Sequence, residues 1–240
     1  MKLELLPGIY VVNLAVWIPK HKLLAIADVH IGYEEYLNSQ GILVPRQQFK
    51  LTKQSLEKIF SEIKIKPDTI IVNGDLKHEF GVISKQEWRE ALEIFDLLAR
   101  HCKKVVLIKG NHDTILEPLA RRKKLQVMDF YCKGEICFTH GHKIFKDREF
   151  EKSKIMIIGN EHPAISIREG VKSELYKCFL LGSWNGKKLV VVPSFLLIIE
   201  GSDLRREQVM SPYLNQHLGK FEVFIVGDRI YRFGRLKDIK

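Results

Sequence analysis

Residues 104–113 read KVVLIKGNHD, an apolar run rich in β-branched residues that ends on a glycine and three polar side chains. A short run of this kind, bounded by such residues, is typical of a buried strand. The same pattern recurs in LLAIA (23–27), TIIVN (69–73), EICFT (135–139) and KIMIIG (154–159), each followed by Asp, Asn, His or Gly. Because ligands of open α/β sheets bind just outside the carboxyl ends of strands, these polar clusters predict a functional site.

Helical patterns separate the first of these strands. Residues 46–63 and 84–99 place apolar side chains at three- and four-residue spacing, and Ser84 with Glu87 forms a candidate capping box. After about residue 125 the strands follow one another closely, with hairpin signals at Lys133-Gly134, Asn185-Gly186 and Gly227-Asp228. We therefore predict an α/β fold, a two-sheet mixed β-sandwich flanked by helices, as a single domain over residues 1–240.

Composition fits a globular chain without membrane segments. Of the 240 residues, 45% are hydrophobic and 28% charged, and no apolar run reaches the roughly 18–20 residues that a membrane helix needs. Glu4 and Pro7 interrupt the apolar N-terminus, MKLELLPGIYVV, which we interpret as a first strand and not as a signal peptide. The expected location is cytoplasmic.

The four cysteines, Cys102, Cys132, Cys137 and Cys178, contain no C-x-x-C pair. This spacing gives no sign of a zinc knuckle or a disulfide framework. A Cys132–Cys137 bridge across a hairpin is the alternative, but buried free thiols are the preferred interpretation.

The formal net charge of +10 favours an anionic partner such as nucleic acid. Basic clusters include Arg121-Arg122-Lys123-Lys124 and Arg205-Arg206. A solvated surface rich in Lys and Glu, as in proteins of hyperthermophiles, explains the same composition. Charge alone leaves both interpretations open.

The strand ends supply carboxylates, imidazoles and amides. Such oxygen and nitrogen donors suit manganese, iron, zinc or nickel better than calcium, and the absence of thiolates there argues against an iron–sulfur centre. Asp28 and His30 project from the same side of an extended strand end and can hold one cation together. Asp75 can bridge two cations about 3.5–4 Å apart, the separation used by two-metal hydrolases.

In order, the motifs are DVH (28–30), GD (74–75), GNHD (110–113), THGH (139–142) and GNEHP (159–163). The series resembles the calcineurin-like metallophosphoesterase superfamily over residues 23–165. The resemblance implies the fold of that superfamily, hydrolysis of a phosphate ester, and two divalent cations. We expect Mn²⁺, with iron, zinc and nickel as alternatives.

The resemblance also implies metal ligands. Asp28, His30 and His162 correspond to ligands of the first metal, with Asp75 as the bridge; Asn111 and His140 correspond to ligands of the second. The last motif departs from the family pattern G-H-x-H, because Asn160 stands where a histidine would bind the second metal. Three interpretations compete: a natural site with a weaker second metal, an engineered variant, or a degenerate binding protein.

Five further roles concern catalysis and substrate. By resemblance, His112 lies near the leaving-group oxygen as general acid or as a cation that stabilises the transition state, and Asp113 orients it through a hydrogen bond. His78 is expected beside the substrate phosphate, and Lys77 can add a phosphate contact. His142 is expected close to the site, behind the metal ligand His140, as a substrate-binding or supporting residue.

Within the superfamily, GDLKHEF (74–80) and the ending G-x-E-H-P-A-I (159–165) resemble a small, archaeal-looking prokaryotic branch of phosphoesterases associated with DNA ligase or a helicase. This branch implies a manganese-dependent nuclease in DNA repair, with a helicase or ligase as possible partner, and some of its members dimerise. The alternatives are a small-molecule nucleotide phosphodiesterase or phosphatase, and a catalytically impaired interaction module.

Overall fold

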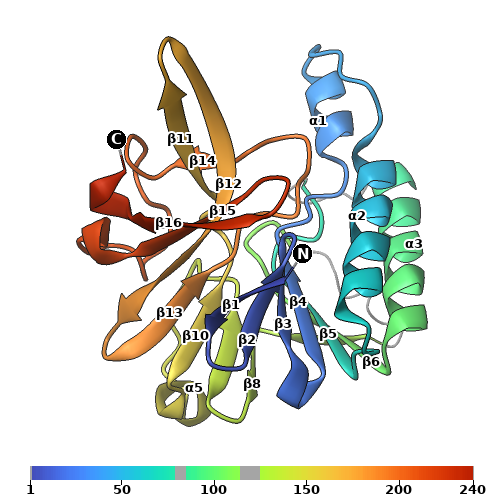
Figure 1. The fold of residues 1–240 in the computed structure, drawn as a ribbon. Coiled ribbons are helices and arrows are strands. Elements are labelled where there is room, and N and C mark those ends of the chain that lie inside the picture. The colour runs from blue at the N-terminus through green and yellow to red at the C-terminus, as the bar shows by residue number, and fades with distance from the viewer. Residues whose placement is uncertain (1, 79–84, 114–124, 240) are drawn as a thin grey trace.

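The computed structural model describes residues 2–78, 85–113 and 125–239, so the predicted capping residue Ser84 lies outside the described part. Two sheets face each other, with helices on the outer face of the first (Figure 1). The first sheet has the strand order β1-β2-β3-β4-β5-β6-β7. Its strands are β1 (Lys2–Leu6), β2 (Ile9–Val12), β3 (Ala15–Ile18), β4 (Leu23–Ala27), β5 (Thr69–Asn73), β6 (Lys104–Ile108) and β7 (Gln126–Met128).

The second sheet has the order β14-β11-β12-β13-β10-β9-β8, and β15 joins it through β12, with β16 beyond β15. Its strands are β8 (Phe130–Lys133), β9 (Ile136–Thr139), β10 (Ile155–Ile158), β11 (Pro163–Glu169), β12 (Lys172–Trp184), β13 (Lys187–Val191), β14 (Ser202–Asp203), β15 (Glu222–Val226) and β16 (Ile230–Arg235). Both sheets contain a parallel part: β4 to β7 in the first, and β9, β10 and β13 in the second.

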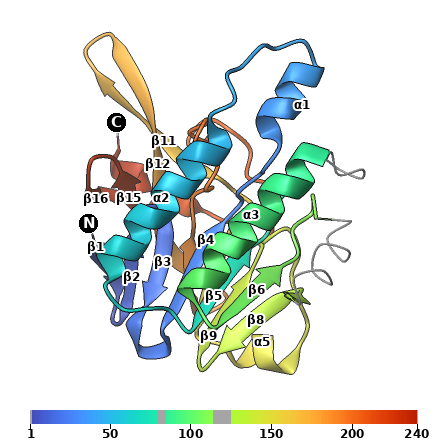
Figure 2. The same ribbon diagram turned by 90° about the vertical axis from the view of Figure 1, so that its right-hand side faces the viewer.

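Helices α2 (Gln48–Ile63) and α3 (Lys85–His101) lie side by side against the first sheet (Figure 2). The shorter helices are α1 (Tyr33–Ser39) and α5 (Arg148–Lys152), with 3-10 turns η1 (Pro19–His21), η2 (Leu218–Lys220) and η3 (Leu236–Asp238). In the part of the chain described, no helix is long and apolar enough to cross a membrane.

Burial on both faces explains why the central strands are apolar throughout. In β4, Leu24 and Ile26 point into the core beneath α2 and α3, whereas Leu23 and Ala25 point into the core between the sheets. Successive side chains of a strand face opposite sides, so a strand covered twice needs an unbroken apolar run. A third core covers the outer face of the second sheet, around Phe150.

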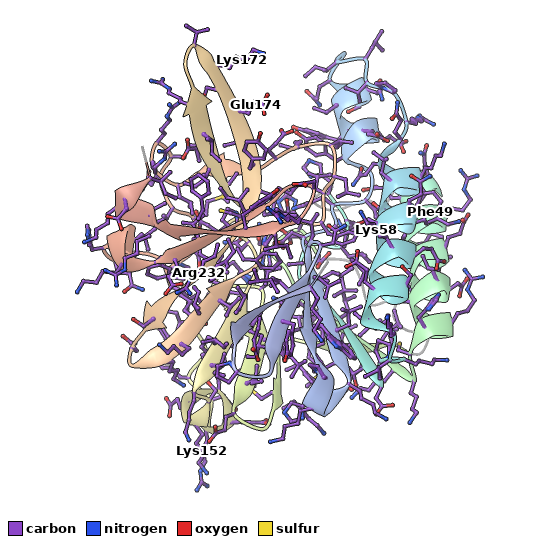
Figure 3. The ribbon with its side chains drawn as sticks, in the orientation of Figure 1. Phe49, Lys58, Lys152, Lys172, Glu174 and Arg232 are labelled. Carbon is purple, nitrogen blue, oxygen red and sulfur yellow. A yellow bond between two sulfur atoms is a disulfide. The ribbon has the colours of Figure 1, made fainter. Side chains whose placement is uncertain are left out.

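The predicted fold class is confirmed, and the five strands predicted between residues 23 and 159 lie within a residue of the observed ones. Strand β3 and helix α1 are among the elements that were not predicted. The N-terminal stretch expected to form one strand is the antiparallel pair β1–β2, and β11 pairs with β12 in a long hairpin. That hairpin and α1 both project beyond the same end of the sheets, and Lys172 lies near the hairpin's tip (Figures 1 and 3).

The preference for free thiols at two of the cysteines was wrong. Cys132 and Cys137 occupy directly opposed positions of the antiparallel pair β8–β9, and a disulfide joins them. Their Cα atoms are 4.1 Å apart. Cys102 and Cys178 are free and buried, as expected.

Candidate metal centre

The polar motifs converge because their strands end at one edge. In the first sheet, Ala27 pairs with Asn73 and Asn73 with Ile108, so the residues that follow start level with one another. In the second sheet, Thr139 pairs with Ile158 in the same way. The Asn73 side-chain amide donates to the Thr139 carbonyl oxygen over 3.0 Å, which joins the two sheets directly below the site.

Asp75 lies at the middle of the cluster and is buried. Its Oδ2 is 3.5 Å from His140 Nε2, 3.8 Å from His30 Nε2 and 3.9 Å from His112 Nε2. Its Oδ1 accepts a hydrogen bond of 2.9 Å from the His112 backbone N–H. The Asp75 carboxylate therefore lies next to imidazole nitrogens carried by both sheets, the arrangement that a ligand bridging two cations requires.

Asp28 contacts the second sheet. Its Oδ1 lies 3.0 Å from His140 Nε2, and its Oδ2 lies 3.6 Å from His162 Nε2. His162 Nε2 is in turn 3.2 Å from His30 Nε2. Ligands bonded to one ion at about 2.1 Å stand about 3.0–3.5 Å apart, so these separations suit a shared cation.

Two groups of donors lie close enough for metal binding, each with its ligand atoms within 4.8 Å of one another. One contains Asp28, Asp75 and His140; the other contains His30, His78 and His112. The second group differs from the expected ligand set, since it adds His78 and His112 beside His30. It places the His78 ring at the centre itself.

Several of these donors have few or no partners. Within the described residues, buried His30 Nδ1 and His78 Nδ1 make no hydrogen bond, and buried Asp28 Oδ1 and His140 Nε2 have only each other, 3.0 Å apart. A buried polar atom without a partner costs on the order of 1–3 kcal/mol. Oxygen and imidazole nitrogen atoms aimed at each other in this way fit divalent cations, which satisfy both kinds of donor at once.

Backbone conformation is unusual at the same residues. Asp28, His30, Asp75, Asn160 and His162 have positive φ angles, between 34° and 65°. Such conformations are uncommon outside glycine, although Asn, Asp and His tolerate them best, and they concentrate at functional sites. The residue types that bind metals are thus also those that these turns accept.

Two glycines allow the ligand loops to approach closely. A Cβ at Gly110 would lie 1.9 Å from Asp75 Oδ1, and a Cβ at Gly74 would lie 2.1 Å from the His140 ring. Any side chain at either position would displace a candidate metal ligand. The glycines of the GD and GNHD motifs are therefore explained by contact between neighbouring loops.

Burial shifts the pKa values in opposite directions for acids and bases. It raises the pKa of Asp75 to about 6 and that of Asp113 to about 7, in the latter case with help from the nearby Asp75 charge. It lowers the pKa of His30 well below the ordinary value and that of His78 to about 4. Divalent cations favour the carboxylate anion and the neutral imidazole. Bound cations would therefore oppose the raised pKa values of the aspartates and act in the same direction as the lowered pKa values of the histidines.

Residues 21–192 match the family model for the calcineurin-like phosphoesterases. The chain belongs to this family. Membership, together with the two donor groups, supports a metal-dependent hydrolase.

One of the solved structures compared shows the same fold, and two others align more weakly. The nuclease MPE of Pseudomonas putida aligns with a TM-score of 0.69 at 18% identity, over 96% of this chain and 98% of that one. A protein of unknown function from Aquifex aeolicus gives a TM-score of 0.38 at 19% identity, over 58% and 78%. Wild-type Vps29 of Entamoeba histolytica, complexed with zinc, gives 0.35 at 17% identity, over 86% of each chain. No curated protein matches the chain.

In this phosphoesterase, His112 is oriented differently from the prediction. Its Nδ1 donates to the carbonyl oxygen of His78 over 2.5 Å. Asp113 accepts instead from the backbone N–H groups of Gly110 and Leu76, each over 3.1 Å. The expected Asp113–His112 ring hydrogen bond is therefore not formed. Asp113 holds together the loops that carry Asp75 and His112, and the His78 carbonyl turns His112 Nε2 toward the centre.

The other predicted substrate residues lie in varied surroundings. His142 Nδ1 is 2.9 Å from His140 Nδ1, so His142 lies against the ring of this candidate metal ligand. The Lys77 side chain is buried, at 2% exposure, which does not favour the predicted contact with a substrate phosphate. Asn111, predicted as a ligand of the second metal and not as a substrate residue, is exposed beside His112.

Asn160 lies at the site and is partly exposed. Its backbone N–H donates to Asp28 Oδ2 over 2.8 Å, which orients that carboxylate. This backbone hydrogen bond to Asp28 does not depend on the side chain at position 160. A change of side chain at this position therefore alters the donor available to a second metal without removing the support of Asp28.

Sequence reasoning missed three residues at the margin of the phosphoesterase centre. Tyr33 and Tyr36 of α1 surround the His78 ring, and the i, i+3 spacing in GYEEY, directly after DVHI, was the available signal. Lys177 of β12 donates to Ser194 Oγ over 2.8 Å. Burial lowers the Lys177 pKa to about 8, against the opposing influence of Glu200 and Asp28.

Proposed function

We propose that this phosphoesterase hydrolyses phosphodiester bonds in nucleic acid with two divalent cations, Mn²⁺ being the expected ion. The observation that carries the proposal is the convergence of Asp28, His30, Asp75, His140 and His162 at one edge of the two sheets. Bound there, the cations lower the pKa of a water molecule and neutralise charge on the phosphoryl oxygens.

The chain's own groups have separate tasks in this proposal. Asp28, His30, His162 and Asp75 hold the first cation, and Asp75, His140, Asn111 and Asn160 hold the second. His112 Nε2, held by the His78 carbonyl at Nδ1, gives a proton to the leaving oxygen or stabilises its charge.

Two observations support nucleic acid as the substrate. The net charge of +10 favours a polyanion, and the structure that aligns over 96% of the chain is described as a nuclease. The DNA-repair role, the archaeal origin and a helicase or ligase partner rest on the branch resemblance and belong to the same proposal.

The test compares three substrates after removal of metal with a chelator. End-labelled single-stranded and duplex DNA are incubated with Mn²⁺ between 50 and 200 mM salt, roughly the range over which phosphate contacts are weakened, beside a mononucleotide diester. We expect metal-dependent cutting of DNA whose kcat/KM falls across that range by about 50-fold for single strands and about 150-fold for duplex, if about four phosphates are contacted. Cleavage of the mononucleotide ester alone would instead establish a small-molecule phosphodiesterase.

Asn160 raises the alternative of an interaction module with an impaired site. We expect Asn160→His to increase binding of the second cation and to raise turnover, because imidazole is a better donor than an amide for these metals. The measurements are metal content per chain and the cleavage rate at saturating Mn²⁺. A variant that gains neither cation nor rate would show that Asn160 does not limit the site.

A further inference from the structure

Three aromatic rings form one margin of the metal centre. Tyr33 and His78 have ring centroids 4.5 Å apart, Tyr36 and His78 4.8 Å, and the two tyrosines 6.3 Å. The His78 ring lies 5.4 Å from that of His112, nearly parallel to it at 26°, and 5.4 Å from that of His30. The tyrosines therefore lie one ring further from the metal ligands than His78.

Helix α1 holds these tyrosines in a fixed position. Its buried Glu34 accepts hydrogen bonds of 2.8 Å from the backbone N–H groups of Gln47 and Gln48, at the start of α2. The Gln48 side chain donates to the carbonyl oxygens of Val29 and His30. The ligand loop, α1 and the beginning of α2 are thus tied together.

The rings themselves have no part in the core. Tyr33, Tyr36 and His78 are partly exposed. Neither tyrosine belongs to, or packs against, the three hydrophobic cores found among the described residues. Partly exposed aromatic rings beside a phosphoesterase centre need an explanation other than folding.

We propose that Tyr33, Tyr36 and His78 form a stacking subsite that receives an unpaired nucleobase next to the phosphate under attack. This inference rests on the proposed function. Aromatic faces bind bases by stacking, worth about 1–3 kcal/mol per base, with little preference for sequence. The bases of an intact duplex are already stacked on their neighbours, so the subsite selects single strands or frayed ends.

The charges nearby favour a base over a phosphate at this position. Helix α1 carries Glu34 and Glu35 between its tyrosines and has no basic residue in its last turn. These carboxylates repel a phosphate, whereas an uncharged base can stack on the aromatic rings beside them.

The test uses two single-stranded oligonucleotides of equal length, one normal and one in which every base is replaced by hydrogen. We expect wild-type kcat/KM to favour the normal chain roughly 10–100-fold. In the Tyr33→Ala/Tyr36→Ala variant this kcat/KM ratio should fall to about 1, because the two tyrosine faces on which a base can stack are removed. Tyr231→Ala, a partly exposed tyrosine of β16, should leave the ratio unchanged, and Tyr33→Phe/Tyr36→Phe should keep it.

A binding measurement separates this inference from the proposed function. Fluorescence anisotropy of both labelled chains with Mn²⁺ should show tighter binding of the normal chain, lost in the double alanine variant. Such binding without any cleavage would overturn the proposed hydrolysis and retain the subsite. An unchanged ratio in the double alanine variant, or equal binding of both chains by the wild type, would overturn the subsite.

Discussion

Asp75→Asn is expected to abolish metal-dependent cleavage, lowering kcat about 10³-fold or more. The substitution keeps the size of the side chain and removes the charge that lies within 4 Å of His30, His112 and His140. An amide has one oxygen and an N–H group, so it cannot bridge two cations through two anionic oxygens. The measurement is single-turnover cleavage of labelled DNA at saturating Mn²⁺.

Metal content gives the second measurement for this variant. We expect Asp75→Asn to retain less than the wild-type number of cations after dialysis, because the lost charge belongs to both sites. The matched control is Asp68→Asn, at a partly exposed carboxylate that pairs with Lys103. Wild-type rate and cation content in Asp75→Asn would remove Asp75 from the centre.

The edge at which the site forms could be predicted because the strands leading to it are buried on both faces. The unbroken apolar runs of β4, β5, β6, β9 and β10 cannot be stable as half-exposed strands, and each ends where polar residues begin. Parallel pairing then brings those ends together without any information on side-chain contacts. The positions of Asp28, Asp75 and His140 follow from strand register alone.

Helix α1 escaped prediction for a physical reason. Its seven residues, YEEYLNS, are too few to show helical periodicity, and Glu34 is its buried residue. Its position depends on the hydrogen bonds that Glu34 accepts from the start of α2, which bring together residues 13 and 14 positions apart. Tertiary contacts of this kind leave no local pattern in the sequence.

Contacts between loops were equally inaccessible. The Cys132–Cys137 bridge requires the register of β8 against β9, which a five-residue separation does not specify. The partner of the His112 ring depends on where the His78 carbonyl points, and burial of Lys77 depends on the elements above it. Motif spacing identified which residues gather at the centre, but not which of them hold the others in place.

His112→Ala is expected to slow cleavage of DNA about 10²–10⁴-fold while leaving the cation content unchanged. His112 Nδ1 is used by the His78 carbonyl, and Nε2 lies 3.9 Å from Asp75 Oδ2, further than the closest ligand pairs. The ring is therefore placed beside the metal ligands, where it can act on the leaving oxygen. His101→Ala, at a histidine stacked on Phe60 of α2, is the matched control.

The leaving group decides between the two roles of His112. A general acid matters most when the departing oxygen needs a proton, as the sugar oxygen of DNA does, and least for a p-nitrophenyl diester, whose leaving group departs without one. We expect the loss in His112→Ala to shrink to about tenfold or less on the p-nitrophenyl substrate if His112 is the acid. Equal losses on both substrates would assign it to charge stabilisation. Loss of a cation in the variant would instead make His112 a ligand, as its grouping with His30 and His78 allows.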